Sequence, residues 1–438
     1  IFSHFPHTPT QGQCEACALL TRFLFDPDPN AAFLLKGYAG TGKTTLVSAL
    51  IQSAPQLKIR TLLLAPTGRA AKVLSSYSGR QAFTIHKKIY TTVTDASGIP
   101  HCARARNKHA YTLFIVDEAS MIGLEGMDDT YAGHRSLLED LIEYVAEGMH
   151  CRLLFIGDTA QLPPVGQPES PALSAEFLTS IAPLKLFEYE LTEVVRQESL
   201  SGILANATTL RQQLSQMEEW DEVQMPLFQE SPDVIRLHGS DLEEVLNREY
   251  AAGGQEDVVL ITRSNKAANL YNQAVRYRCL GHDDELSTGD YLMVVRNNYT
   301  WLGDESEMGF IANGDIVEVL RLRRHEEMYG FHFVDATLRF VDYPDMPHLD
   351  CKLLLETLHS ESPSLTRDEH QNLFHAVMAD YADLPTKSER MEALRKDPYY
   401  NALQVKFAYA LTCHKTQGGQ WPVVFVDQGY LTDDMLTR

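Results

Sequence analysis

The sequence predicts an α/β protein with parallel sheets, and three observations support this. Short apolar runs alternate with helical stretches through the first half of the chain, as in a parallel sheet covered on both faces. The same alternation returns at 257–265 and 421–429. Between those two runs, residues 276–403 hold turns and strand-like pieces followed by polar helical sequence. We therefore expect two α/β domains, the second interrupted by a β-rich insertion with helices.

The first domain is expected at 1–88 and 112–200, with strands at 32–37, 60–67, 112–120, 152–158 and 184–191. Residues 89–111 interrupt it. Gly98, Ile99 and Pro100 lie there between two polar, partly β-prone arms, which predicts a hairpin. The second domain is expected at 201–275 and 404–438, on either side of the 276–403 insertion.

Composition narrows the class of protein. The 438 residues carry a net charge of −21, which by itself argues against a nucleic-acid partner, because phosphates are bound by Lys and Arg. No apolar run reaches the roughly 18 residues of a membrane span, and the N-terminus lacks a signal-peptide pattern. Without such a run, no membrane partner is expected. The odd number of cysteines, 7, predicts no disulfide framework and a cytoplasmic protein. We read Cys14 and Cys17 as ordinary helix cysteines.

The run "GYAGTGKTT" follows a predicted strand and opens a predicted helix, the setting of a phosphate-binding loop. Backbone N–H groups of such a loop wrap phosphates at the positive end of the helix. Lys43 supplies a point charge, and the Thr44 hydroxyl can ligate Mg²⁺. The expected phosphate-contacting residues are Gly37, Ala39, Gly40, Thr41, Gly42, Lys43, Thr44 and Thr45.

An acidic pair supplies the catalytic partner of this loop. The apolar strand "FIVDEAS" ends at Asp117 and Glu118; Asp117 is expected to hold Mg²⁺ through water, and Glu118 to polarise the attacking water. No base-reading N-K-x-D motif is present, so ATP is preferred over GTP. The sequence therefore predicts ATP hydrolysis with Mg²⁺.

Further polar stretches are not needed by a plain ATPase. Asp158 and Gln161 end a neighbouring strand, where a side-chain amide can sense the γ-phosphate. Thr67 has an ordinary explanation as a helix N-cap, His86 as a satisfied surface histidine, and Arg196 as a solvated charge. The order in which these stretches occur along the chain, however, is more informative than any one of them alone.

Together these stretches resemble the superfamily 1B DNA helicases of the RecD-like and PIF-type group. The resemblance covers nearly the whole chain and rests on nine motifs that occur in the family's order: "GYAGTGKTT", "APTGRAA", "TIHK", "VDEASM", "GDTAQLPPVG", "EVVRQ", "ITRSN", "NGD" and "ALTCHKTQGGQW". It implies two RecA-like P-loop domains with parallel sheets, a small hairpin insertion at 89–111 that separates strands, and a β-rich SH3-like insertion at 276–403. It also implies ATP between the domains and 5′→3′ movement on single-stranded DNA.

The resemblance assigns roles at matching positions. Gln13 resembles the adenine-contacting glutamine, with Gln11 a close competitor; Arg196 resembles the arginine at the γ-phosphate, and Gln161 the coupling glutamine. The ATP-side residues of the second domain are Gln417, Gly418 and Gln420. The implied DNA contacts are Pro66, Thr67, Gly68, Thr84 and His86 in the first domain and Thr262, Asn265, Thr412, His414 and Lys415 in the second.

Two departures from the family pattern stand out. Gln420 replaces a frequent glutamate, and the chain stops at "LTDDMLTR" where a final arginine-bearing motif would begin. The negative net charge is compatible with DNA if Arg69, Lys72, Lys87, Lys88 and Lys415 line the track.

The sequence leads to a helicase that acts as a monomer on single-stranded, forked or tailed duplex DNA. Two alternatives remain: a translocase or nucleotide-switched DNA-binding module that does not unwind duplexes, and an ATPase that regulates a protein partner.

Overall fold

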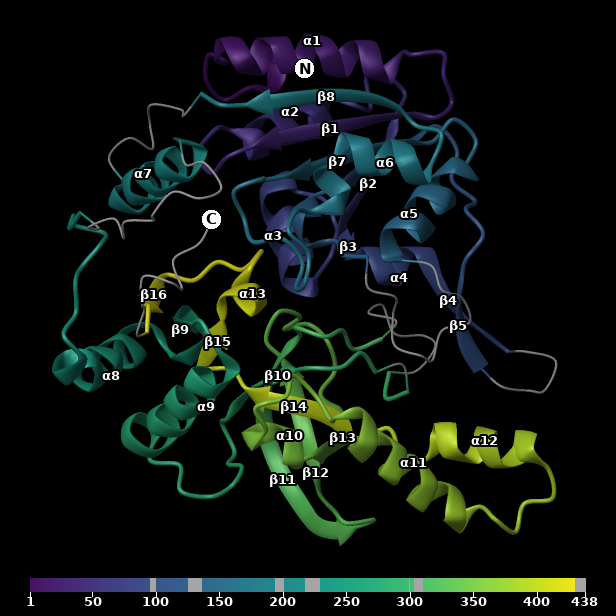
Figure 1. The fold of residues 1–438 in the computed structure, drawn as a ribbon, viewed down its shortest axis with the longest axis vertical. Helices are drawn as coiled ribbons and strands as arrows, with labels where there is room; N and C mark the ends of the chain where they lie inside the picture. Colours follow the sequence, from purple (N-terminus) through teal and green to yellow (C-terminus); the bar gives the residue numbers. More distant parts are fainter. Residues whose placement is uncertain are drawn as a thin grey trace.

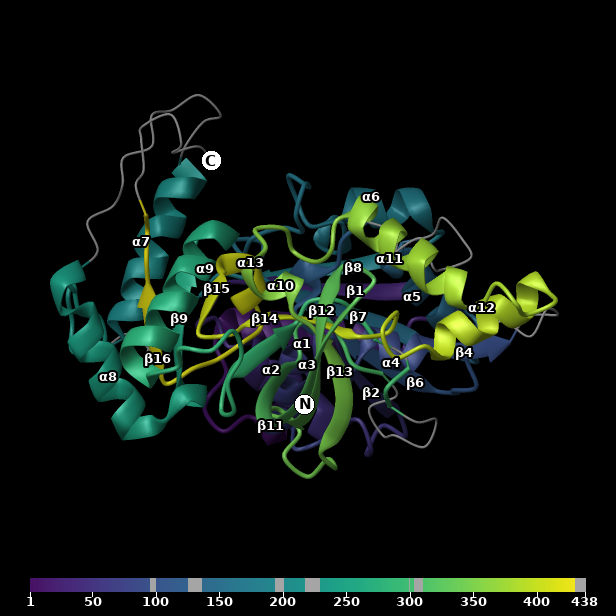
Figure 2. The same cartoon turned by 90° about the horizontal axis from the view of Figure 1, so that it is seen from below.

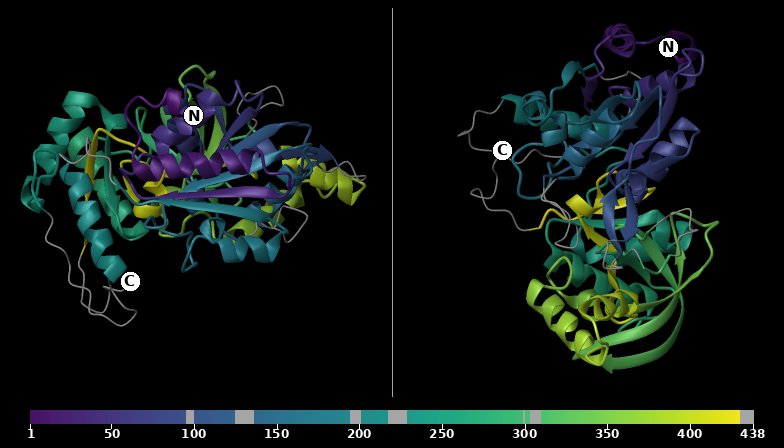
Figure 3. Two further views of the ribbon diagram at one scale, coloured as in Figure 1. Left: turned by 90° about the horizontal axis from the view of Figure 1, so that it is seen from above. Right: turned by 90° about the vertical axis from the view of Figure 1, so that its right-hand side faces the viewer.

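The computed structural model describes residues 1–94, 100–124, 136–193, 201–216, 229–298, 300–302 and 310–429. Figure 1 shows a parallel sheet with its helices in the upper half and a barrel with α11 and α12 in the lower half. The two parts are seen one above the other in the right-hand view of Figure 3.

The first sheet has six strands in the order β3-β2-β6-β7-β1-β8, all parallel. They are β1 (Ala31–Gly37), β2 (Arg60–Ala65), β3 (Ala82–Thr84), β6 (Thr112–Val116), β7 (Arg152–Gly157) and β8 (Lys185–Leu191). Each strand predicted from an apolar run in this half of the chain is present, and the expected parallel α/β class is confirmed.

Helices cover this sheet on both faces because alternate strand residues point to opposite sides. Phe33 and Leu35 of β1 pack with α1 (Gln11–Leu24), α2 (Lys43–Ser53) and α3 (Gly68–Ser78). Leu34 packs on the other face with α4 (Ile85–Ile89), α5 (Leu137–Ala146) and α6 (Ala175–Ile181). All three β1 residues are fully buried, which explains the unbroken apolar run in the sequence.

The insertion predicted at 89–111 forms a hairpin. Strands β4 (Tyr90–Thr94) and β5 (Pro100–Arg104) pair antiparallel, with Tyr90 opposite Arg104. The tip, 95–99, lies outside the described residues.

The second sheet has three parallel strands in the order β15-β9-β16. They are β9 (Val258–Thr262), β15 (Ala410–Thr412) and β16 (Val423–Val426). Helices α7 (Gly202–Gln216), α8 (Leu242–Gly253) and α9 (Asn265–Ala274) belong to the same half of the chain and lie to one side of the barrel in Figure 2. Strands as far apart in sequence as β9 and β16 are thus neighbours, as two pieces of one domain must be.

The predicted β-rich insertion is a closed barrel of β10 (Tyr291–Val294), β11 (Ile316–Met328), β12 (Phe331–Phe340), β13 (Leu349–Leu354) and β14 (Leu403–Phe407). Its interior is apolar, with Val294, Val317, Leu338 and Leu353 buried together. Closure leaves no free sheet edge. The barrel includes β14 and so continues past residue 403. Helices α10 (Glu356–His359), α11 (Arg367–Asp380) and α12 (Lys387–Lys396) join β13 to β14.

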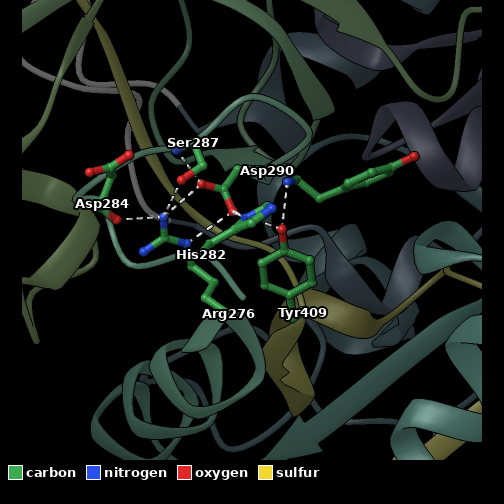
Figure 4. Close-up of polar contacts among 7 residues, drawn as sticks. Arg276, His282, Asp284, Ser287, Asp290 and Tyr409 are labelled. Atoms are coloured by element: carbon green, nitrogen blue, oxygen red, sulfur yellow. Dashed lines mark hydrogen bonds and ion pairs between the residues drawn. The ribbon is translucent and has the colours of Figure 1, made fainter. Parts of the chain in front are cut away.

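A buried polar network fastens the barrel to the second sheet (Figure 4). Arg276 donates from Nε and Nη2 to the two oxygens of Asp290, each at 2.9 Å. Tyr409 donates its hydroxyl to Asp290 Oδ1 at 2.9 Å, and His282 Nδ1 lies 3.0 Å from the same oxygen. Tyr409 immediately precedes β15, so this network positions the segment 410–427.

Candidate nucleotide-binding cleft

The phosphate loop lies at the carboxyl end of β1, where parallel sheets bind ligands. Gly40 and Gly42 have φ of 76° and 79°, a left-handed backbone that glycine adopts without a steric cost. Helix α2 begins at Lys43 directly after them, so its first N–H groups face the loop. The strand, loop and helix predicted from the sequence are all present.

Lys43 is held inside the loop by backbone carbonyls. Its Nζ donates to Gly37 O and, at 2.9 Å, to Tyr38 O. Burial lowers the pKa of Lys43, whereas Asp158, Glu118 and Asp117 act in the opposite direction. The ammonium thus lies among carboxylates, ready for a stronger anionic partner.

The acidic pair lies at the carboxyl end of β6. Asp117 accepts hydrogen bonds from the Tyr77 hydroxyl and, at 2.9 Å, from Glu118 N. Burial raises the pKa of Asp117. Burial, and secondly the Asp117 carboxylate, raise the pKa of Glu118 to about 7. Glu118 also adopts a left-handed φ of 52°, a strain that is found most often at functional sites.

Gln161 reaches the acidic pair from the loop after β7. Its Oε1 accepts from the Ser120 hydroxyl at 2.9 Å, and its side-chain hydrogen bond to Glu118 lowers the pKa of that carboxyl. The predicted coupling glutamine therefore contacts the predicted catalytic glutamate directly.

These groups line one cleft of about 660 Å³ between the two halves of the chain. The first half contributes the loop, the acidic pair, Gln161 and one side of α3. The second half contributes Glu256, Asp257, Val341, Asp342, Gln420, Trp421 and Pro422. A movement of the two halves relative to each other would therefore open or close the cleft.

Arg69 and Lys72, which were predicted to line a DNA track, line this cleft and pair with Asp342; their contact with DNA stays a prediction. Lys72 Nζ lies 3.2 Å from Asp342 Oδ1, and Arg69 Nε lies 3.6 Å from Oδ2. The Arg69 guanidinium also lies 4.3 Å from the centre of the Trp421 ring. The two cations thus join α3 to the second half of the chain.

Gln13 and Gln11 occupy different environments. Gln13 is buried; its side chain completes the capping box of α1 with Thr10 and donates to Gly42 O at 3.4 Å. Gln11 is exposed and bonds Glu15 at 2.9 Å. Gln13 is therefore the glutamine beside the phosphate loop, while its contact with adenine stays a prediction.

The segment that follows β15 contacts both the first half of the chain and the barrel side. Gln417 Nε2 donates to Leu162 O at 2.8 Å, one residue beyond Gln161. A Cβ on Gly418 would lie 3.0 Å from Ala70 Cβ and 3.7 Å from Glu118 Cγ. Lys415, in α13 (Cys413–Thr416), donates instead to Asn313 Oδ1 of the barrel side at 2.8 Å.

The predicted DNA contacts of the first half lie at the carboxyl ends of β2 and β3. Thr67 and Thr84 cap α3 and α4, each accepting a backbone N–H at 3.2 Å. A Cβ on Gly68, which follows Pro66 and Thr67, would lie 2.7 Å from Asp315 Oδ1. The barrel therefore approaches this edge closely.

His86 is half-buried. Its ring packs against Tyr90 and Phe310, with centroids 5.8 Å and 6.2 Å away, and burial lowers its pKa to about 4. Any contact with DNA would therefore involve the neutral imidazole.

Two predicted contacts of the second half are neighbours across the sheet, since Thr262 pairs with Thr412. Thr262 is only 1% exposed, and its hydroxyl donates to Ser264 O at 3.1 Å. Asn265 begins α9 just after it, and His414 is exposed. Thr262 thus shapes the turn that carries Asn265.

Arg196, within 194–200, and the final segment 430–438 lie outside the described residues. Sequence reasoning missed Tyr77, Asp342 and Trp421. Of these, only Trp421 carried a local signal, because it directly follows Gln420.

No group of three or more His, Cys, Asp or Glu side chains in the described ranges could hold a metal ion. None of the helices in those ranges is long and apolar enough to cross a membrane. Thr44 and Asp117, the expected Mg²⁺ residues, line the same cleft. One carboxylate and one hydroxyl suit a Mg²⁺ ion that takes its other ligands from water and phosphate.

Two protein families match the chain: the AAA domain family over residues 11–224, and the UvrD-like helicase C-terminal domain family over residues 407–438. The ATP-dependent RecD2 DNA helicase of Deinococcus radiodurans is 32% identical over 274 residues, which cover 61% of this chain and 34% of that protein. The ATP-dependent DNA helicase dda of Enterobacteria phage T4 is 29% identical over 211 residues, which cover 46% and 42%. The chain thus spans less than half the length of these curated relatives.

Among solved structures, the crystal structure of Pif1 helicase from Bacteroides in complex with ADP-AlF3 and ssDNA covers 99% of this chain and 95% of that chain. The identity is 14% and the TM-score 0.45.

The fold and the cleft define the class: a nucleotide-binding protein with a phosphate loop on a parallel sheet. Along the chain, the AAA domain match at 11–224 precedes the UvrD-like helicase C-terminal match at 407–438. By these matches the chain is similar to the AAA domain family over residues 11–224 and to the ATP-dependent DNA helicases RecD2 and dda.

Proposed function

We propose that this protein is an ATP-driven DNA helicase that moves 5′→3′ on single-stranded DNA and separates duplexes. One observation carries the proposal: a single cleft has the phosphate loop and acidic pair on one side and the Gln420–Trp421 segment on the other. A ligand bound there contacts both halves, so its arrival and departure change how they fit together.

The residues of the cleft suit ATP hydrolysis. The loop and Lys43 bind the phosphates, and Thr44 and Asp117 would hold Mg²⁺, which neutralises phosphate charge when bound. Glu118, with a pKa of about 7, accepts the proton of the attacking water in its ionised form. Gln161 orients that carboxylate, and Arg196 is the proposed cation at the γ-phosphate.

Coupling to DNA runs through the segment after β15. Gln417 touches the Gln161 loop, and Lys415, two residues away, touches the barrel side at Asn313. A shift of this segment on ATP binding therefore moves cleft and barrel together. His414, Asn265 and Thr412 lie at the same end of the second sheet, where we place the DNA strand.

The β4–β5 hairpin is the proposed pin that parts the duplex at a fork or tail. Because phosphate contacts are independent of sequence, we expect single-strand affinity to fall steeply with salt. We place the protein in the cytoplasm, acting as a monomer on DNA.

The deciding experiment compares ATPase activity with and without single-stranded DNA. We expect stimulation by DNA, and Lys43→Ala should lower the stimulated rate by at least about 100-fold because phosphate charge is left unbalanced. Lys185→Ala is the matched control, since Lys185 pairs with Asp26 on the surface. A wild-type rate unaffected by DNA would favour an ATPase that regulates a protein partner.

A translocase that does not unwind is the second candidate, and deletion of 92–108 separates the two. The helicase proposal expects this deletion to keep DNA-stimulated hydrolysis and to lose strand separation on a tailed duplex. Unchanged unwinding would remove the pin from the proposal.

A further inference from the structure

We propose that Arg211, on α7, is a positioning residue of the nucleotide site: it places a second cation beside the phosphate loop and makes α7 respond to phosphate. The inference rests on nucleotide binding by the loop, and so on the proposed function, but it requires no DNA.

Arg211 contacts the phosphate loop through an aromatic ring. Its guanidinium lies 4.2 Å from the centre of the Tyr38 ring, a favourable cation–π distance. Tyr38 lines the nucleotide cleft, and its carbonyl accepts from Lys43 Nζ at 2.9 Å and from the Thr41 hydroxyl at 2.7 Å. Arg211 therefore stacks on the residue whose backbone holds Lys43.

The geometry of both partners is constrained. Arg211 Nη2 donates to the Thr208 hydroxyl one turn earlier in α7, at 3.2 Å. The Tyr38 side chain is half-buried and makes side-chain hydrogen bonds with Glu190 and Thr159. Hydrogen bonds therefore restrain both the guanidinium and the ring of the stacked pair.

The negative charge around Lys43 explains why a second cation would help to bind phosphate. Asp117, Glu118 and Asp158 lie close enough to Lys43 to raise its pKa, and Arg211 is the cation that acts on it in the opposite direction. A polyphosphate that binds here comes close to these carboxylates, which repel it. A nearby cation attracts it strongly, because the local dielectric constant is low. Arg211 adds positive potential at the point where that charge arrives.

Hydrogen bonds join the first turns of helix α7 to the segment 229–233. Gly202 N and the Ser201 hydroxyl both donate to Asp233, at 2.9 Å, and Asn206 exchanges hydrogen bonds with the backbone of Gln229. Phosphate that attracts the guanidinium therefore pulls on a helix joined to 229–233, and nucleotide occupancy reaches the second half without passing through Gln417.

The test is a double-mutant cycle on the full chain without DNA, read as the Kd for a fluorescent ATP analogue. Arg211→Ala should weaken binding about ten-fold, or about 1.4 kcal/mol, and Arg211→Lys should recover most of it. In a Tyr38→Leu background the same Arg211→Ala change should have little further effect, because the ring that holds the cation is gone. In a Tyr38→Phe background the ten-fold loss should remain.

Arg248→Ala is the matched control, because Arg248 is an exposed cation of α8 that forms an ion pair with its neighbour Glu249. It should leave Kd unchanged. The inference is overturned if Arg211→Ala binds like the wild type, or if its effect is the same with and without the Tyr38 ring. Wild-type nucleotide binding with no DNA stimulation would instead count against the helicase proposal and leave Arg211 in place.

Discussion

Glu118→Gln should stabilise the protein at alkaline pH while it removes catalysis. An ordinary glutamate has a pKa of 4.5, whereas Glu118 has one of about 7 because burial and Asp117 disfavour its charge. At 1.36 kcal/mol for each pH unit, this difference corresponds to about 3 kcal/mol spent on burying the carboxylate. Glutamine has nearly the same shape and no charge to bury.

The sign follows from proton linkage. The folded state binds the Glu118 proton more tightly than the unfolded state, so stability falls as pH rises from about 4.5 to about 7 and then levels off. At pH 8 the variant should therefore be more stable than the wild type by up to about 3 kcal/mol. At pH 5, where the native carboxyl is protonated, the gain should fall below about 1 kcal/mol.

The assay is urea unfolding of both proteins without nucleotide, at pH 5 and pH 8. Glu176→Gln, an exposed position on α6, is the control and should show little gain at either pH. In parallel, Glu118→Gln should bind ATP without turning it over, and wild-type turnover should rise as pH passes about 7. Equal stability of wild type and variant at pH 8, or the same gap at both pH values, would refute the reasoning.

Three further changes test other parts of the structure. Gly419→Ala should displace Trp421 and shift tryptophan emission, because the new Cβ would lie 2.4 Å from a ring carbon; an unchanged spectrum would show that the ring moves freely. Tyr77→Phe removes a hydrogen bond that lowers the pKa of Asp117, so half-maximal hydrolysis should need several-fold more Mg²⁺, and an unaltered Mg²⁺ dependence would contradict this. Arg276→Met removes the guanidinium from the buried Asp290 carboxylate, which keeps only its contacts with Tyr409, His282 and Ser287 among the described residues, and should cost about 3–5 kcal/mol in urea unfolding; a loss below about 1 kcal/mol would mean that water replaces the guanidinium.

Much of the architecture was predictable because it is local. The apolar runs of β1, β6 and β7 specify strands buried on both faces, and glycines at Gly40 and Gly42 specify the loop that follows β1. Thr67 was given both a structural and a functional prediction. It caps α3, as the structural prediction requires, and it also lies at the sheet edge where a DNA contact was expected.

Other side chains were placed differently because their partners are far away in sequence. Arg69 and Lys72 look like free cations on a helix, yet Asp342, some 270 residues later, pairs with both. The net charge could not predict these ion pairs, because it does not show which carboxylate pairs with which cation. His86 likewise lies against Phe310, more than 220 positions later in the chain.

By itself, the sequence determined the phosphate loop, the acidic pair, the strands and the order of family motifs, since each depends on neighbouring residues and on the periodicity of burial. Tertiary structure alone decided that Gln13 rather than Gln11 lies beside the loop, that Thr262 is buried, and that Arg211 reaches Tyr38. The physical reason is that burial and pairing belong to contacts between distant segments, and the cleft forms only where the two halves of the chain meet.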